Sequence, residues 1–392
     1  MINIKDKDFI QNPYPTFKKM RNSGKPFWIP IDEEYSSGGL WLFSTYADAM
    51  VIFKETKSIS KNLRVIKNSS SLSPWDTHLL NQDGSEHLRL RRLVADYFTI
   101  QASHKLSRMI HTICENLLSS FLAHECTDLV HDFATPLPLQ IIAKIVGIPD
   151  SEFDQIRYWT KSIIIDSLGI TDEMKQQRTR SICDFSDYLN RLINAQYYND
   201  GHGLIGYLLF SKKEGNISHD ELIGMVIFLL VAGHETTIDL IGNALYLLLS
   251  NPDQFEMLKK SPKLIPNAVE EVLRFESPTQ RTTFRLAIDK IEFPNFTVQK
   301  GEQIAVLIGS ANRDETVFLE PDTFNIRRGS NLNLAFGGGL HNCLGRSLAK
   351  TEAQIAINNF VKHLSHARLK NIEPVWKNSL FLRGLNSLPI II

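Results

Sequence analysis

The longest regular pattern of apolar and polar positions in the chain covers residues 219–250 and predicts one long helix. Ser218 and Glu221 form the Ser-x-x-Glu capping box that is typical of a helix start, and Asn251-Pro252 is a typical stop. At 1.5 Å per residue, a helix of this length would extend about 48 Å. The pattern therefore predicts a helix long enough to cross a whole domain.

The apolar part of this helix indicates where it lies. Its continuous apolar run, Leu222–Val231, is too short to cross a bilayer. The polar residues His234, Glu235 and Asp239 follow directly after the run. A buried central helix is the interpretation that fits both observations.

Other segments predict a mainly helical protein with small sheets. Helical periodicity covers roughly 87–146, 151–198, 266–275 and 345–365. Strand-forming residues gather at 40–44 and 284–308, with a turn at Lys300-Gly301 inside the second region. Neither a linker nor a repeat interrupts the sequence, so we expect residues 1–392 to form a single domain.

Composition narrows the class of protein. Lys and Arg total 43, as do Asp and Glu, so charge gives no reason to expect nucleic acid or a membrane surface as a partner. The N-terminal residues are polar, which predicts neither a signal peptide nor a membrane anchor. None of the four cysteines has metal-site spacing with another. We therefore expect a cytoplasmic protein in which a cysteine matters through its chemistry.

The segment Phe336-Gly-Gly-Gly-Leu-His341-Asn-Cys343-Leu-Gly345 carries the strongest chemical signal. Glycines allow a backbone to approach a flat group closely, and a helix starting near Leu344 would place its positive end beside the Cys343 sulfur. Phe336 can pack beside the sulfur, and a basic residue at 341 can meet an acidic group. The plainer alternative is a structural cysteine in a glycine-rich turn. The combination favours a thiolate ligand to haem iron.

This segment resembles the haem-binding loop of the cytochrome P450 family, Phe-x-x-Gly-x-His/Arg-x-Cys-x-Gly, at every fixed position. The resemblance extends from Asn12-Pro13-Tyr14 to the C-terminal Leu-Pro-Ile and is closest to soluble Bacillus-type members that act on polyketides or carrier-bound fatty acyl chains. It implies a triangular, mainly α fold with haem b buried between the long central helix and the cysteine loop. It also implies Cys343 as the iron ligand of a monooxygenase that uses dioxygen.

A second motif, Ala232-Gly-His-Glu235-Thr236-Thr237, lies in the middle of the long helix. Glycine within a helix costs about 1 kcal/mol relative to alanine, which suggests a local opening here. By resemblance, Glu235 relays protons and Thr236 acts on the oxygen side of the haem. The alternative is a kink whose threonines bond back to the helix carbonyls. A zinc-protease helix is excluded because residue 238 is Ile238 where that motif needs histidine.

Two further groups of charged residues match the family pattern. Glu271 and Arg274 are three apart and share a helix face. The resemblance gives them a structural role with a third arginine, for which Arg328 is the candidate and Arg327 the alternative. A solvated surface pair is the plainer interpretation. By resemblance, the haem propionates and the edge of the haem are contacted by His87, Arg91, Arg285 and His341, with Phe336 and Gly345 completing the cofactor loop.

The substrate is the part least determined by the sequence. By position, the pocket residues are expected to include Phe228, Ala232, Thr282, Thr283 and Phe381. We expect a hydrophobic polyketide or secondary-metabolite intermediate, with a fatty acid or carrier-bound acyl chain as the alternative. The expected partners are a separate ferredoxin or flavodoxin with its reductase and, in the acyl case, an acyl carrier protein. Their docking site is predicted at four cations: Arg89, Arg92, Arg346 and Lys350.

Other classes of protein fit less well. Gly337–Gly339 is not followed by the pattern of a dinucleotide site or a P-loop, and no Gly-x-Ser-x-Gly hydrolase motif is present. A non-catalytic haem carrier or gas sensor has no use for the acid–alcohol pair Glu235 and Thr236. Peroxide-driven relatives place a cation there instead. The pair therefore favours dioxygen and two electrons.

Overall fold

The computed structural model describes residues 6–31, 38–67, 72–122, 124–164, 170–194, 203–329, 332–370 and 373–392. The chain forms two compact units: unit 1 is Met1–Ser60, Leu106–Leu137 and Thr236–Ile392, and unit 2 is Lys61–Lys105 and Pro138–Glu235. Both units are discontinuous in sequence, and the helices α6 (Ile100–Phe121), α7 (Pro136–Val146) and α11 (His219–Ser250) each carry the chain from one to the other. The single domain expected from the sequence stays a prediction.

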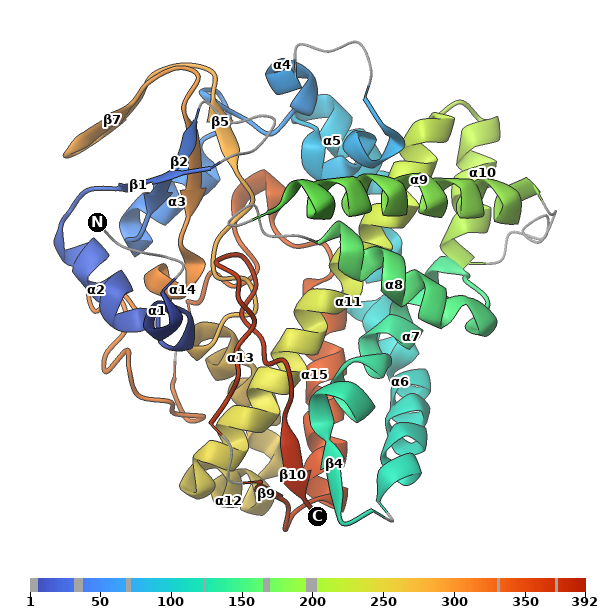
Figure 1. Ribbon diagram of the computed structural model, residues 1–392, viewed down its shortest axis with the longest axis vertical. Helices are drawn as coiled ribbons and strands as arrows, with labels where there is room; N and C mark the ends of the chain where they lie inside the picture. Colours follow the sequence, from blue (N-terminus) through green and yellow to red (C-terminus); the bar gives the residue numbers. More distant parts are fainter. Residues whose placement is uncertain are drawn as a thin grey trace. The chain divides into compact units, whose positions relative to one another are not determined.

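A mixed sheet organises the N-terminal and C-terminal parts of unit 1 (Figure 1). Its strands, in spatial order, are β1 (Phe27–Pro30), β2 (Gly39–Phe43), β8 (Gln303–Val306), β5 (Arg285–Ala287) and β3 (Ile59–Ser60). Only β2 and β8 pair in parallel. Apolar residues of β2 and β8, including Phe43 and Val306, enter one buried cluster with Ile52 of α3 (Tyr46–Lys54). Arg285 is paired with Ile304 in this sheet, and this backbone pairing positions the Cα from which the arginine side chain extends.

Two smaller sheets complete the strands of unit 1. One has the order β4 (Cys126–Asp128), β10 (Pro389–Ile391) and β9 (Arg368–Leu369), and the other is the hairpin of β6 (Ile291–Phe293) and β7 (Phe296–Val298). Gly301 has a φ of 90°, a left-handed conformation that glycine adopts without strain. The turn predicted at Lys300-Gly301 is therefore confirmed.

Unit 1 also contains several helices. Besides parts of the shared helices, they are α1 (Lys7–Gln11), α2 (Tyr14–Asn22), α3, α12 (Pro252–Lys260), α13 (Ile265–Phe275), α14 (Ile308–Ala311) and α15 (Arg346–His363). Helix α13 buries residues on one face, including Val269 and Val272, and packs against α15. This pairing brings α13 next to the helix that follows the cysteine loop.

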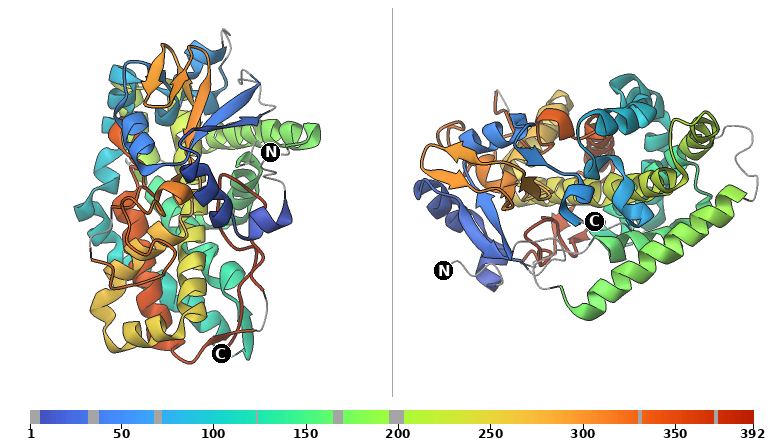
Figure 2. Two further views of the ribbon diagram at one scale, coloured as in Figure 1. Left: turned by 90° about the vertical axis from the view of Figure 1, so that its left-hand side faces the viewer. Right: turned by 90° about the horizontal axis from the view of Figure 1, so that it is seen from above.

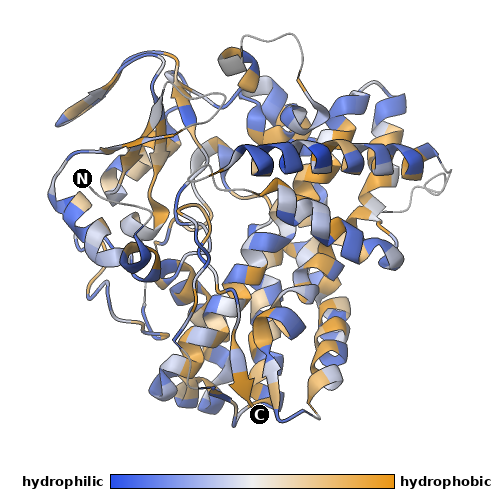
Figure 3. Ribbon diagram, viewed as in Figure 1, coloured by the Kyte–Doolittle hydropathy of each residue, from blue (hydrophilic) through white to orange (hydrophobic). Residues whose placement is uncertain are grey.

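Unit 2 is helical in the described residues. Its helices are α4 (Leu63–Lys67), α5 (Gly84–Ala95), α8 (Phe153–Ile163), α9 (Asp172–Asn194) and α10 (Gly203–Lys213), with the first half of α11. Helix α9 is one long straight element (Figure 2), and much of its surface is hydrophilic (Figure 3). Its apolar side packs on α8, where the rings of Trp159 and Phe185 stack at 4.9 Å.

The structure confirms the predicted central helix. Helix α11 covers His219–Ser250, and its capping box is formed, with Ser218 N donating to Glu221 at 2.8 Å and Glu221 N to Ser218 at 3.2 Å. Length and composition alone would allow α11 to span a membrane, but 67% of its most apolar window is buried inside the protein. An internal core helix explains both its length and its composition.

The other long helical predictions were too continuous. The stretch 87–146 divides into α5, α6 and α7, with β4 between α6 and α7, and 151–198 divides into α8 and α9. Apolar periodicity does not mark where a helix stops and the chain reverses, because neighbouring helices can keep the same period. Helices α13 and α15 agree with the predicted 266–275 and 345–365 within two residues at each end.

Candidate haem site

The loop that carries Cys343 is closed by its own backbone. Cys343 N donates to the Phe336 carbonyl at 2.9 Å, and Gly337 N donates to Leu334 at 2.8 Å. Asn342 N donates to Gly339 at 3.3 Å. Cys343 is exposed on this hydrogen-bonded loop. A thiol held in this way can act as a ligand without further rearrangement of the backbone.

The glycines of the loop adopt the unusual backbone angles expected of them, and one of them also has a packing reason that the sequence did not show. Gly337 and Gly339 have φ values of 64° and 65°, which other residues rarely adopt. A Cβ on Gly339 would also lie 1.8 Å from the carbonyl oxygen of Phe53, at the end of α3. The close approach that requires glycine here is therefore between the loop and α3.

Phe336 and the start of α15 form the other side of the loop. The Arg346 guanidinium and the Lys350 ammonium lie 5.8 Å and 5.5 Å from the centre of the Phe336 ring. Gly345 is the N-cap of α15, two residues after Cys343. Because helix N-termini carry partial positive charge, this position favours the thiolate form of a nearby cysteine.

Arg285 is a buried cation suited to an external anion. Its side chain leaves β5 and donates through Nη1 to Thr282 Oγ1 at 2.9 Å and to the Thr283 carbonyl at 3.3 Å. Among the described residues no carboxylate pairs with it. Burial lowers the pKa of the Arg285 guanidinium to about 10. A carboxylate from a bound group would compensate this desolvated charge.

The other predicted propionate partners are ordered but belong to different units. His87 and Arg91 lie on α5 in unit 2, and His341 lies in unit 1 with Arg285. His87 is fully buried, and its Nδ1 lies 2.8 Å from the Leu79 carbonyl. A carbonyl only accepts, so Nδ1 carries a proton and Nε2 forms the opposite edge of the ring. Convergence of the four residues on one ligand stays a prediction.

The middle of α11 is accessible although its flanks are buried. Leu222–Val231 and Ile238–Leu248 are mostly buried, whereas Ala232 is exposed and Glu235 and Thr236 are half-buried. A helix that is buried on both sides of such a stretch has a local face available to a ligand. The acid and alcohol predicted from the sequence both lie in this stretch.

His234 is a residue whose role the sequence analysis missed. Its ring is fully buried, with Nδ1 2.5 Å from the Leu230 carbonyl and Nε2 3.2 Å from Thr160 Oγ1 on α8. The same Nε2 lies 3.6 Å from Glu235 Oε1. Because Nδ1 faces a carbonyl and carries the proton of a neutral ring, Nε2 can donate to Glu235 only when the imidazole is charged. In the sequence, the position of His234 directly before Glu235 was the one pointer to this contact, and it served above only to exclude a zinc site.

The expected opening of α11 at Gly233 is not a break in the helix, which is continuous from His219 to Ser250. A Cβ at Gly233 would lie 2.8 Å from Ile142 Cγ1 on α7. Close packing of two helices thus accounts for this glycine. The prediction of an opening was wrong because glycine was interpreted from backbone preference alone.

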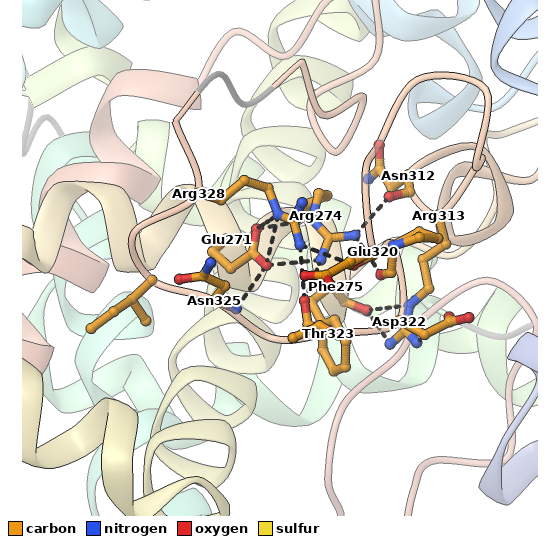
Figure 4. A network of polar contacts seen from close by, with 12 residues as sticks. Glu271, Arg274, Phe275, Asn312, Arg313, Glu320, Asp322, Thr323, Asn325 and Arg328 are labelled. Atoms are coloured by element: carbon orange, nitrogen blue, oxygen red, sulfur yellow. Dashed lines mark hydrogen bonds and ion pairs between the residues drawn. The ribbon is translucent and has the colours of Figure 1, made fainter.

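Glu271, Arg274 and Arg328 form one buried network, in which Glu271 lies between the two guanidinium groups (Figure 4). Arg274 donates to both Glu271 oxygens at 2.8 and 2.9 Å, and Arg328 Nε donates to both at 3.1 and 3.0 Å. Glu271 and Arg274 have no exposed side-chain surface. The alternatives of a solvated pair and of Arg327, which is exposed, are excluded.

This network organises the segment that leads into the cysteine loop. The two arginines donate to the carbonyls of Asn312, Leu319, Glu320, Pro321 and Thr323. Asn312 Oδ1 in turn accepts from Leu334 N at 2.7 Å, directly before the loop. Glu270, the neighbour of Glu271, contacts Asn333 at 3.0 Å and pairs with Lys350 of α15. Helix α13 thereby holds the loop from both ends.

The predicted pocket residues have mixed surroundings. Thr282 Oγ1 accepts from Val306 N at 3.1 Å as well as from Arg285, so its hydroxyl is used within the protein. Phe228 stacks on His78 at 4.3 Å. Phe381 and Thr283 are half-buried. The structure therefore favours a structural task for Thr282, and the shared pocket stays a prediction.

Two of the four cations predicted to dock a redox partner are neutralised within the protein. Arg89 pairs with Glu86 at 2.7 Å and with Glu221 at 2.5 Å. Lys350 pairs with Glu270. The sequence spacing predicted which helix face each of these two cations occupies. It could not show that Glu221 and Glu270, on neighbouring helices, pair with them. The two predicted cations with exposed side chains are Arg92 and Arg346.

Comparison with known proteins agrees with this site. The family description "Cytochrome P450" matches residues 164–387. Cytochrome P450 107B1 of Saccharopolyspora erythraea is 35% identical over 98% of this chain and 96% of its own. The polyketide biosynthesis cytochrome P450 PksS of Bacillus subtilis is 32% identical over 100% and 98%. The solved structure of P450BioI with hexadec-9Z-enoic acid-ligated acyl carrier protein superposes with a TM-score of 0.90 at 31% identity, covering 98% of this chain and 99% of that one.

The fold and the cysteine loop define a haem-thiolate oxygenase, and the chain belongs to the cytochrome P450 family. It is an oxidoreductase, a monooxygenase whose cofactor is haem b. The residues present fit this cofactor, because its iron, propionates and ring require an exposed thiol, a buried arginine that pairs with no carboxylate of the described residues, and an accessible face in mid-α11.

Proposed function

We propose that this enzyme inserts one oxygen atom from dioxygen into a polyketide-type intermediate, with a fatty acyl chain, free or carrier-bound, as the second candidate. Similarity to PksS over the whole chain supports the first substrate class. The likeness to P450BioI bound to an acylated carrier protein supports the second. Both classes are largely apolar molecules with few polar groups.

The observation that carries the proposal is the composition of one face of α11. Phe228, Ala232 and Thr236 are spaced by four residues and therefore share this face. The half-buried ring and the exposed methyl group suit an apolar substrate. The Thr236 hydroxyl and the neighbouring Glu235 carboxylate begin where the apolar part ends. Such a face can bind a hydrocarbon at its apolar positions and donate or accept protons at the adjacent hydroxyl and carboxylate.

Each site residue then has a defined task. Cys343 would hold the iron, and Arg285, His87, Arg91 and His341 would bind the propionates. The bound haem supplies the centre at which dioxygen is activated. Glu235, whose carboxylate lies beside the buried His234 ring, would pass protons from solvent, and Thr236 would hold a proton at its Oγ1.

The function is tested with oxygen-18 gas, a reduced ferredoxin or flavodoxin system, and three substrate probes. The probes are free hexadec-9-enoic acid, the same chain linked to an acyl carrier protein, and a linear polyketide chain. We expect one class to shift the haem absorption spectrum on binding and to yield product with one labelled oxygen atom. Turnover with peroxide alone should be slower. Haem binding without labelled product from any probe would favour a carrier or sensor.

Thr236→Ala should uncouple electron consumption from product formation. The variant keeps the helix and the haem pocket but removes the hydroxyl that holds the proton. We expect the product formed per electron pair to fall about tenfold. Losing a positioned proton donor typically costs ~10²-fold or more, but here a water molecule can enter and replace part of the hydroxyl's role. Peroxide release should rise in parallel.

Thr236→Ser is the matched control, since it restores the hydroxyl and should recover most of the coupling. Substrate-binding spectra should be the same for all three proteins. Unchanged coupling in Thr236→Ala would transfer the role to Thr237 or to a water molecule.

We also propose that the enzyme acts in the cytoplasm and receives electrons from a separate ferredoxin or flavodoxin with its reductase. The exposed cations Arg92 and Arg346 are available for an acidic partner, whereas Arg89 and Lys350 are already paired. An acidic partner would be steered by these charges, with an association rate that falls as salt is added.

A further inference from the structure

A buried ion pair joins α11 to a turn near the C-terminus. Asp239 lies one helical turn beyond Thr236 and is 1% exposed. Lys377 Nζ reaches Asp239 Oδ1 at 2.8 Å, and its side chain is 25% exposed. Both residues belong to unit 1. A carboxylate so deeply buried needs its cation close by, so Lys377 must stay with α11.

The lysine lies at the base of a turn formed by residues 376–385, which we call the 376–385 turn. Lys377 N donates to the Gly384 carbonyl at 2.8 Å, and Trp376 and Leu385 form a β-bridge. At the other end of the turn, the Phe381 carbonyl accepts from Gln280 N at 2.8 Å. The base of the turn is thus closed by its own backbone, and the tip is bonded to the segment that contains Gln280.

A second contact fixes the turn to the same face of α11. Asn243, four residues after Asp239, donates to the Arg383 carbonyl at 2.8 Å. A Cβ on Gly384 would lie 1.8 Å from Asp239 Oδ1, so the turn backbone rests directly on the carboxylate. The two sides of the turn therefore contact α11 at two successive helical turns, through Asp239 and Asn243. The same helix carries Thr236.

We propose that Asp239 and Lys377 are positioning residues that set the distance between the tip of the 376–385 turn and Thr236, and thereby determine which length of apolar substrate is accepted. The inference rests on the proposed function and on the prediction that Phe381 lines the substrate pocket. The Phe381 ring lies 5.4 Å from the Arg281 guanidinium, so the tip is also guided from the segment before β5. Through the backbone of the turn, we expect a shift at Lys377 to reach the tip, which is held from the other side by the bond from Gln280 N to the Phe381 carbonyl.

The test uses the haem-loaded protein with two variants, Lys377→Met and Asp239→Asn/Lys377→Met. The single variant takes the Lys377 cation away from a buried carboxylate and can fail to fold. The double variant removes both charges, so it should keep normal haem content and melting temperature while losing the ion pair. Lys290→Met, which breaks an exposed pair with Glu292 on the β6–β7 hairpin, is the matched control.

Two measurements are made on each protein. Hydrogen exchange at the Lys377 and Arg383 amides should become about tenfold faster in the double variant, because local opening of the turn becomes easier. The ratio of dissociation constants for lauric and palmitic acid, measured from spectral shifts, should change about tenfold, the size of effect expected for methylene groups in an apolar pocket. Lys290→Met should change neither quantity.

The two measurements separate the inference from the proposed function. Unchanged exchange in the double variant overturns the tether. Faster exchange with an unchanged lauric-to-palmitic ratio overturns its role in specificity. If the unaltered enzyme binds neither acid, fatty acids are excluded as substrates, and the exchange result alone decides whether the tether exists.

Discussion

Cys343→His is expected to abolish monooxygenase activity and the far-red-shifted Soret band of the ferrous–carbon monoxide complex. The band requires a thiolate ligand, which donates more electron density to iron than imidazole does. Because the loop is closed by its own backbone, from Phe336 to Cys343, the substitution should leave the loop intact. Haem can therefore remain bound while the thiolate signature is lost.

The natural control for this prediction is a second exposed cysteine. Cys126 on β4 is exposed and belongs to the same unit. Cys126→Ser should retain the thiolate spectrum and full activity. A normal thiolate spectrum in Cys343→Ala would contradict the ligand assignment, since none of the other cysteines, Cys114, Cys126 and Cys183, has a comparable loop.

Local patterns were sufficient for some elements and insufficient for others. The capping box, apolar run and Asn-Pro stop located α11 at the observed residues, because each acts within one helix turn. The break between α6 and α7 depends on β4 pairing with β10, more than 250 residues later in the chain. No local signal encodes such a pairing, so the helical period seemed continuous.

The candidate site shows the same division. Glu271 and Arg274 were predictable because three residues of spacing place them on one face. The choice of Arg328 over Arg327, the pairing of Arg89 with Glu221 and the contact of Gly339 with Phe53 depend on tertiary packing. Asp239 and Lys377 are 138 residues apart and match no motif. They become a candidate pair only when the fold brings them together.

The second large effect is expected at Glu271, because it is the carboxylate shared by the buried guanidinium of Arg274 and the partly buried guanidinium of Arg328. It accepts from Arg274, Arg328 and the Asn325 backbone, with no exposed surface. Glu271→Gln keeps the shape but leaves two cations without their anion. Burial lowers the pKa of the Arg274 guanidinium, and the Glu271 carboxylate opposes this effect. Breaking such a pair should cost about 3–5 kcal/mol of folding free energy.

Urea unfolding and the yield of haem-loaded protein measure this loss for Glu271→Gln, and the adjacent Glu270→Gln provides the control. Glu270 is 26% exposed and pairs with the amine of Lys350, so its loss should cost about 1 kcal/mol or less. The Glu271 variant should yield little haem-loaded protein, because the segment 312–328 and the Asn312–Leu334 bond before the cysteine loop depend on the network. Fully loaded Glu271→Gln with wild-type stability and low turnover would instead assign Glu271 to the reaction itself.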